Sequence, residues 1–253
     1  MRILVTHLTR MREDRICVAG LTNTGEHVRP VADEQVLDRS HLLANGGLFD
    51  VGAVVELGEV EDVGVKPEVE DRLFALASAR YEFHLEPDTY WKFASAHVKP
   101  GLREIFGPDL QPVGGTMIVP VAKGEASLGA FAPKSGPELF LDDRGRVRAR
   151  LNHSGSSLRL PVTDIRVYDQ RLNPREDVME WLNRECRQGC VLTVGLSRPF
   201  KGASRPIEEH WLQINNLHPA SDPLWMNAPG STVNSQEKGL VDPAATTRLR
   251  VVK

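Results

Sequence analysis

The chain has 253 residues, of which 41% are hydrophobic and 26% are charged. This composition supports a folded core and excludes an intrinsically disordered chain. The formal net charge of −3 argues against a protein coated all over in positive charge, although it permits a local basic face.

The cysteines and the N-terminus indicate the compartment. The three cysteines are too few, and odd in number, for a disulfide framework, which favours a reducing compartment. The opening stretch MRILVTHLTR fits neither a signal peptide nor a membrane span, and no later stretch is long enough to cross a bilayer. We therefore expect a cytoplasmic protein that does not associate with a membrane.

The first half of the chain reads as strands followed by helices. Short β-branched runs separated by turn residues predict strands in RILVTHL, RICVAGL, EHVRPV and DVGAVVELGEV. Residues 67–107 change character: a helix is predicted to follow Pro67, with others at about 88–93 and 100–107. We expect this block to be a helical insertion in the first β-rich unit.

The second half reads as strands around one helix. Strands are predicted in TMIVPVA, ELFLDD, RVRARL, SLRLPVTDIRVYD, CVLTVGLS and HWLQINNL, with NHSGSS as a hairpin turn. The order Asn173, Pro174, Glu176 is that of a capped helix start, which predicts a helix over about 174–188. Residues from 227 onward resemble a solvated tail in which RLRVV could add an edge strand.

The fold class expected from these elements is mainly β with a few helices. Gly20-Leu21-Thr22 followed by Arg29-Pro30-Val31 has a counterpart in Gly195-Leu196-Ser197 followed by Arg205-Pro206-Ile207. One such pair in each β-rich half favours duplication of a small β-fold. The expected division is therefore a first barrel at 1–123, a second barrel at 124–226 and a tail at 227–253.

Six stretches resemble one known family. VTHLTRM, ICVAGLTNTGEHVRPV, FDVGAVVELG, LPVTDIRVYD, VGLSRPF and HWLQINNLH are similar, in this order, to the bacterial dual OB-containing domain family. The resemblance covers about Arg2 to Trp225. It implies two OB-like β-barrels and a nucleic-acid connection within prokaryotic conflict or defence systems. It brings no catalytic residues with it.

Alternating arginines mark the first candidate site. Alternate side chains of a strand point to opposite faces, so Arg146, Arg148 and Arg150 are expected to face outward while Val147 and Ala149 face the interior. Arg159 on the partner strand is expected to join them. Like charges so close repel each other, and a phosphate backbone would relieve that repulsion. The alternative is that Glu138, Asp142 and Asp143 neutralise exposed arginines that have no ligand.

Further candidates lie outside this strand. Proline restricts the residue before it to extended geometry, which fixes the backbone direction of Arg29, Arg198 and Arg205. Each is either a fork for a phosphate or a turn residue paired with an acid. Single-strand binders add aromatic stacking faces, for which the candidates are Trp211, Tyr168 and Trp225. The remaining candidates for nucleic-acid contact are Arg10 and Gln213.

No motif of an enzyme is present in the sequence. Neither a phosphate-cradling loop nor a nucleophile elbow occurs, and no metal or cofactor is expected. The reading favoured is a binding module for nucleic acid, preferably single-stranded, or for a nucleotide-like ligand. The alternatives are a protein-interaction module and a nuclease or nucleotide-processing site assembled from His7, His27, His210 and Glu209.

Overall fold

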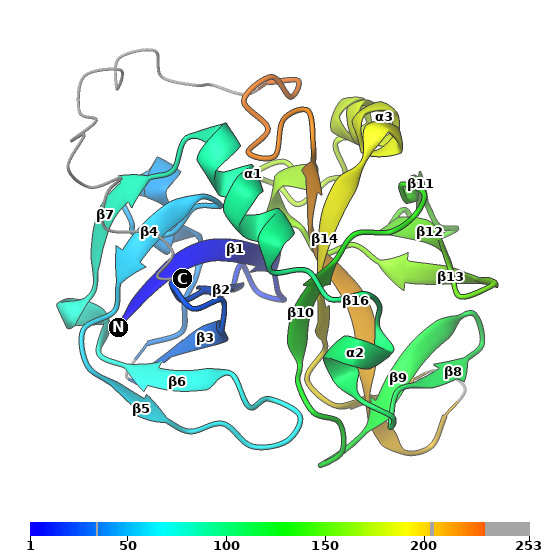
Figure 1. Cartoon of the computed structure of the whole chain (residues 1–253), viewed down its shortest axis with the longest axis horizontal. Coiled ribbons are helices and arrows are strands. Elements are labelled where there is room, and N and C mark those ends of the chain that lie inside the picture. Colours follow the sequence, from blue (N-terminus) through cyan, green and yellow to red (C-terminus); the bar gives the residue numbers. More distant parts are fainter. Residues whose placement is uncertain (34, 203–204, 231–253) are drawn as a thin grey trace.

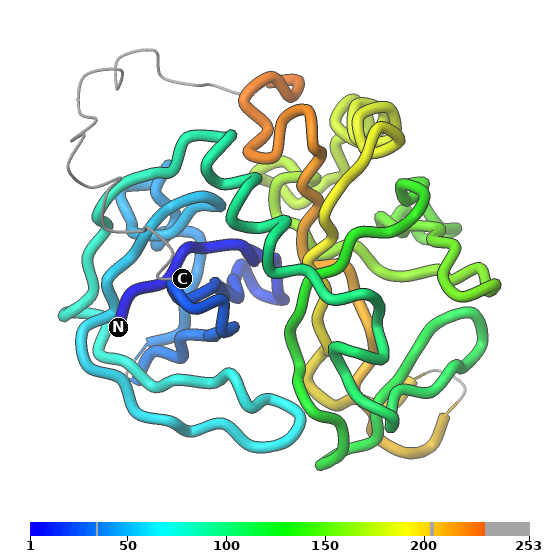
Figure 2. The backbone as a smooth tube through the Cα atoms, viewed as in Figure 1, coloured from blue at the N-terminus to red at the C-terminus, as the bar shows by residue number. Residues whose placement is uncertain are grey.

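The computed structural model describes residues 1–33, 35–202 and 205–230. The chain forms two β-rich units that lie side by side, with β1–β7 in the first and β8–β16 in the second (Figures 1 and 2). This arrangement confirms the expected mainly β fold with few helices. The predicted edge strand RLRVV lies outside the described residues.

The first unit is one seven-stranded sheet in the order β5-β6-β3-β2-β1-β4-β7. Its strands are β1 (Arg2–Arg10), β2 (Ile16–Leu21), β3 (His27–Ala32), β4 (Ala53–Glu56), β5 (Val60–Asp62), β6 (Asp71–Phe74) and β7 (Arg80–His84). Because β6 and β7 pair on opposite sides of the sheet but are joined by residues 75–79, the sheet must curl around its core. Ile3, Val5, Val18 and Val28 are among the side chains buried inside.

The helix predicted after Pro67 is wrong. Asp71–Phe74 is strand β6, which pairs with β3 on one side and β5 on the other, and Leu76–Ser78 is a short 3-10 helix. Pairing on both edges outweighs the weak local helical pattern, because secondary-structure propensity is easily overridden by tertiary contacts. The other two predicted helices are present as α1 (Pro87–Ala96) and α2 (Arg103–Phe106), but they follow β7 and connect the two units.

The second unit combines two sheets. A longer sheet has the order β10-β14-β16-β9-β8 with β15 on β16, and a three-stranded sheet has the order β11-β12-β13. The strands are β8 (Gln111–Val113), β9 (Thr116–Pro120), β10 (Leu128–Phe131), β11 (Glu138–Leu141), β12 (Val147–His153), β13 (Ser156–Pro161), β14 (Cys190–Leu196), β15 (Phe200–Lys201) and β16 (Glu208–Pro219). A parallel bridge from Val162 to Ile214 joins the two sheets.

The predicted hairpin and helix of the second unit are confirmed, but the predicted capped start is wrong, because the helix begins at Glu176 after Arg175 and no side chain caps it. β12 and β13 pair in register from Arg148↔Pro161 to His153↔Ser156, with Ser154 and Gly155 in the turn. Helix α3 (Glu176–Glu185) continues into a 3-10 turn at Cys186–Gln188. It lies between β13 and β14, where its buried face, including Val178 and Leu182, closes the core of the second unit.

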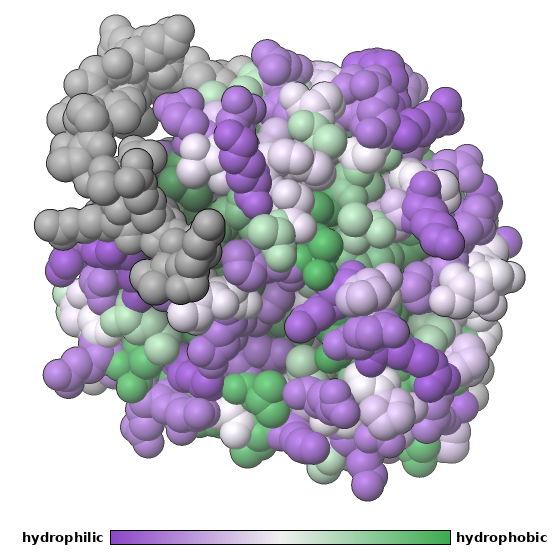
Figure 3. All heavy atoms as spheres, viewed as in Figure 1, coloured by the Kyte–Doolittle hydropathy of each residue, from purple (hydrophilic) through white to green (hydrophobic). Residues whose placement is uncertain are grey.

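The remaining 3-10 helices are short and lie in loops, at Arg39–His41, Leu43–Asn45 and Ile165–Val167. On the face seen in Figure 3, hydrophilic residues dominate and apolar residues form small scattered groups. No helix in the described part of the chain is long and apolar enough to span a membrane.

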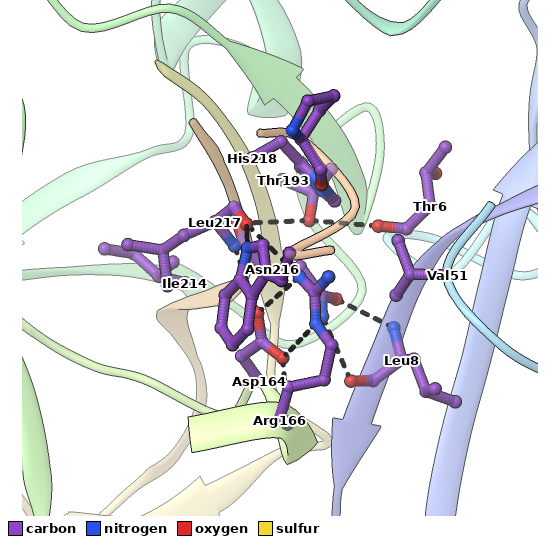
Figure 4. A network of polar contacts seen from close by, with 12 residues as sticks. Thr6, Leu8, Val51, Asp164, Arg166, Thr193, Ile214, Asn216, Leu217 and His218 are labelled. Atoms are coloured by element: carbon purple, nitrogen blue, oxygen red, sulfur yellow. Dashed lines mark hydrogen bonds and ion pairs between the residues drawn. The ribbon is translucent and has the colours of Figure 1, made fainter. Parts of the chain in front are cut away.

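Asn216 on β16 joins the two units through the backbone of β1. Its side-chain oxygen accepts a hydrogen bond from the Leu8 N–H at 2.7 Å, and its amide nitrogen donates to the Leu8 carbonyl at 3.2 Å (Figure 4). Asn216 and Leu8 are both buried. One side chain therefore satisfies both polar groups of a residue that has no other strand on that side.

Two carboxylates extend this polar junction. Asp164 is fully buried and accepts two hydrogen bonds from the Arg166 guanidinium, at 3.0 and 2.9 Å, and one from the Leu217 N–H at 3.2 Å (Figure 4). Glu70, which precedes β6, accepts from the Ser127 and Leu128 N–H groups and from the Ser127 hydroxyl, all within 3.0 Å. The Glu70 bonds cross between the units and help to fix their relative position, whereas the Asp164 bonds hold the loop after β13 against β16 within the second unit.

The Asn216→Ala variant is expected to lose about 2–4 kcal/mol of unfolding free energy, because the buried N–H and C=O of Leu8 would each lose a partner. Urea unfolding followed by tryptophan fluorescence measures this loss. Asn152→Ala, at an exposed position of β12, is the matched control and is expected to change stability by less than about 0.5 kcal/mol. Equal losses in the two variants would contradict the role given to Asn216.

Stability is also expected to fall in acid through buried histidines. Burial, assisted by the charge of Arg166, lowers the pKa of His218 from 6.5 to about 3, and burial also lowers the pKa of His7. Between pH 6.5 and about pH 3, His218 binds a proton in the unfolded chain but not in the folded chain. The free energy of unfolding therefore falls as the pH drops from 6.5 toward 3. Above pH 6.5 His218 does not contribute to the pH dependence of stability.

Replacing His218 by Asn removes the titrating group and keeps a polar side chain near the Tyr90 hydroxyl, which lies 3.1 Å from the His218 Nδ1. The variant is expected to lose less unfolding free energy than the wild type between pH 7 and pH 4, by up to about 1.4 kcal/mol per pH unit within the window. Parallel stability curves for the two proteins would show that His218 does not carry this dependence.

Candidate nucleic-acid interface

The sheet β11-β12-β13 presents arginines on its outer face. Val147, Ala149 and Leu151 of β12 point into the core, so Arg148 and Arg150 point outward, as the alternation predicted. On β13, Leu158 and Leu160 are in the core and Arg159 is exposed. Arg150 and Arg159 are direct cross-strand partners. We call Arg146, Arg148, Arg150 and Arg159 the arginine face.

Carboxylates neutralise this face only in part. Asp142 forms ion pairs with two guanidinium groups, at 2.7 Å from Arg146 and 3.0 Å from Arg148. Glu138 forms an ion pair with Arg150. In the described part of the chain no carboxylate pairs with Arg159. The four arginines therefore have two paired carboxylates, which leaves a surplus of two positive charges.

The Arg146 and Arg150 side chains are open to solvent, whereas the Arg148–Asp142 pair is half-buried, at 23% and 18% exposed. The side chains of Arg146 and Arg150 are 49% and 42% exposed. Exposed pairs contribute only about 0–1 kcal/mol, which an incoming phosphate can replace. Partial burial raises the pKa of Asp142, but hydrogen bonds from the side chain and backbone of Arg146 and from Arg148 outweigh it and hold this pKa well below its usual value. Asp142 is therefore a carboxylate at any physiological pH.

Arg29 and Arg198 lie elsewhere, at the junction of the two units. The Arg29 Nε is 2.5 Å from Asp71, and Arg198 contacts both Asp71 at 3.0 Å and Glu68 at 3.2 Å. The Arg29 and Asp71 side chains are below 10% exposed. Arg29 therefore has its charge compensated inside the protein, whereas the side chain of Arg198 is half exposed at the edge of the junction.

The remaining arginine candidates also have internal partners. Arg205 lies 2.5 Å from Glu209, which is buried. The Arg10 guanidinium packs over the ring of Tyr168 at 4.1 Å and donates to its hydroxyl at 3.3 Å. The structure therefore brings Arg146, Arg148, Arg150 and Arg159 together on one sheet face, whereas Arg29, Arg198 and Arg205 are paired with carboxylates elsewhere, and Arg10 packs on Tyr168. Burial raises the pKa of Tyr168, while the charges of both Arg10 and Arg148 act to lower it.

Of the aromatic candidates, Tyr168 and Trp225 are buried and have no open face. Trp211 is half-buried on β16 and stacks on Phe200, which itself is 48% exposed. Gln213, two residues further on β16, donates to the side chain of Asn215 at 3.2 Å. Phe200 was missed in the sequence because nothing in SRPFKG distinguishes an exposed phenylalanine from a buried one.

The second unit covers one face of the first unit. His7, Ala19, Leu21 and Arg29 point away from the core of the first unit and are nevertheless buried. The side chain of Asn215 on β16 contacts His7 at 3.1 Å, which shows that the second unit supplies the cover. The outer face of β1–β3 is thus closed, while that of β12–β13 is open.

The four residues considered for a nuclease site are buried or half-buried and are not gathered in one place. His7 and His27 have ring centroids 5.4 Å apart, but His210 contacts the Ser197 carbonyl and Glu209 binds Arg205. His7, His210 and Glu209 are each below 3% exposed. Across residues 1–33, 35–202 and 205–230, no three His, Cys, Asp or Glu side chains are grouped so as to hold a metal ion.

Three solved structures share a weak similarity in shape with this chain. A murine DNA-binding protein bound to double-stranded DNA has a TM-score of 0.31 at 10% identity, covering 85% of this chain and 91% of that one. The HINa domain of Ifi202 with double-stranded DNA has a TM-score of 0.32 at 8% identity, with coverages of 85% and 95%. A structure described as structural mimicry for functional antagonism has a TM-score of 0.30 at 8% identity, with coverages of 82% and 86%.

Comparison with curated proteins finds none that matches the sequence. The sequence profile of dual OB-containing domains matches residues 1–217, which span both β-rich units. The curled sheet of the first unit, the two joined sheets of the second, and the helix after the third strand of the β11–β13 meander agree with two OB-type barrels. The chain belongs to the dual OB-containing domain family.

Proposed function

We propose that the chain binds nucleic acid through the arginine face of its second barrel. The observation that carries the proposal is the surplus of positive charge there: four guanidinium groups on one face, two of them sharing Asp142 and one without a carboxylate. A polyanion supplies the missing negative charge and releases its own counterions.

The position of this face within the barrel supports the proposal. OB-folds bind oligonucleotides across the face of their second and third strands and through the adjoining loops. In the second barrel these strands are β12 and β13, and the loop before β12 contributes Arg146. The matching face of the first barrel is covered by the second barrel, so one binding face per chain is the expected outcome.

The form and setting of the nucleic acid are also part of the proposal. A curved, narrow strand face with a separate aromatic residue suits a single strand better than a duplex. A role in a prokaryotic conflict or defence system, in the cytoplasm, rests on the family resemblance alone. Gln213 would contact the same ligand only where the bound oligonucleotide continues from β13 to β16.

Replacing Arg148 and Arg159 by Ala, one on each strand, is expected to weaken binding of a labelled single-stranded oligonucleotide about tenfold at low salt. The slope of log affinity against log salt is expected to fall by about 1.4, because each phosphate contact contributes about 0.7 for a single strand. Fluorescence anisotropy over a range of KCl concentrations measures both quantities.

The matched control replaces two arginines outside the arginine face, Arg80 on β7 and Arg184 on α3, whose side chains are 67% and 65% exposed. This variant removes the same charge and is expected to keep the salt slope of the wild type. If both double variants lose affinity equally, the arginine face has no special role and the effect is that of net charge.

Asp142→Asn is expected to act in the opposite direction. The variant removes the negative charge that Arg146 and Arg148 share, while the amide oxygen can still accept the backbone N–H groups of Arg144 and Arg146. Oligonucleotide affinity should rise severalfold at low salt and the salt slope should steepen. A loss of affinity with an unchanged unfolding midpoint would show that Asp142 orders the arginines for binding.

A further inference from the structure

Phe200 is an apolar side chain on the surface of the second barrel. The residue is 48% exposed, and its ring stacks on that of Trp211 with an angle of 26° between the planes and centroids 5.7 Å apart. An offset parallel stack covers one face of a ring and leaves the other open. One face of the Phe200 ring therefore lies against Trp211, while the residue as a whole is half exposed.

The position of this ring is fixed from several sides. Phe200 and Lys201 form β15, which pairs with Glu209 and Glu208 of β16. The Trp211 Nε1–H donates to the Phe200 carbonyl at 3.2 Å, and a side chain at Gly202 would collide with the Trp211 ring. The backbone at Phe200 and Gly202 therefore lies close against Trp211.

The Phe200 ring and the arginine face are linked through strands β16 and β9. Leu212 and Ile214 of β16 are in the core, so Trp211 and Gln213 point away from it, and Phe200 pairs with Glu209, which is buried. Strand β9 connects the two places. Its Ile118 pairs with Trp211, and Gly115, three residues or roughly 10 Å away, accepts a hydrogen bond from the Arg159 N–H.

The arginine face and the ring are thus close enough for one extended chain to contact both. We propose that Phe200, supported by Trp211, is a base-stacking position of the interface and that its ligand is an unpaired base. This inference rests on the proposed function, and it names the form of nucleic acid as a single strand. In a duplex the bases are already stacked on each other and cannot lie on the ring.

The observations favour a base over a protein side chain on this ring. The open surface is a flat face and not a pocket, and the next residue, Lys201, is exposed and cationic. Arg198, on the same loop, is half exposed but paired with Glu68 and Asp71. Flat aromatic faces next to cations are the elements from which sequence-tolerant single-strand sites are built.

The experiment compares two probes of equal length on the full chain. One is a labelled oligothymidylate of about twelve nucleotides and the other is the same deoxyribose-phosphate chain without bases. Phe200→Leu keeps an apolar side chain against Trp211 but removes the aromatic face. The variant is expected to bind oligothymidylate roughly 5- to 100-fold more weakly, with an unchanged salt slope and unchanged binding of the abasic chain.

Two further variants make the result specific. Phe200→Trp is expected to bind oligothymidylate at least as tightly as the wild type, in contrast to Phe200→Leu, because a larger aromatic face is available. Ile207→Ala shortens a neighbouring apolar residue that is 55% exposed. It is expected to leave the binding of both probes unchanged. The unfolding midpoint of each variant confirms that the fold is intact.

The possible failures are distinct. If Phe200→Leu binds oligothymidylate like the wild type while Arg148→Ala with Arg159→Ala binds weakly, the stacking inference is wrong and the proposed function stands. The exposed ring would then belong to a protein-contact surface. If the wild-type chain binds neither probe at any salt concentration, both the proposed function and the stacking inference are wrong.

Discussion

The packing of the second barrel on the outer face of β1–β3 is the constraint on which the rest of the structure depends. Asn216 replaces a missing strand neighbour for Leu8, and Glu70 does the same for the edge of β10 at Leu128. Both are buried polar contacts that hold only when their geometry is right. They fix the two barrels in one arrangement, and that arrangement decides which surfaces remain open to a ligand.

The same packing sorts the arginines into two classes. Arg29 is buried at the junction and paired with Asp71, which gives it a structural role. On the arginine face, solvent screens the pairs, and one carboxylate is divided between two guanidinium groups. The difference matters for binding because a buried pair is costly to break, whereas an exposed pair exchanges readily for a phosphate. A near-neutral chain can in this way keep a local cationic surface.

Two OB-type barrels in one chain do not imply two equivalent binding faces. The first barrel gives its strand face to the junction and so acts as the support on which the second barrel is held. The second barrel keeps its strand face and adds a stacked pair, Phe200 on Trp211, at the far end of β9. Charge and aromatic surface are therefore contributed by different strands of one barrel, and the separation between them is set by the β-sheet.

The sequence by itself determined most of the strands, the β12–β13 hairpin and helix α3, because alternation, apolar periodicity and turn residues act over a few neighbouring residues. It also determined that the arginines of β12 share one face. It did not determine that residues 71–74 form a strand, since that depends on pairing with β3 and β5. Nor could it show that Arg29 is buried, that Asp142 is shared or that Phe200 is exposed. Those properties depend on which distant surfaces meet, and only the tertiary structure decides that.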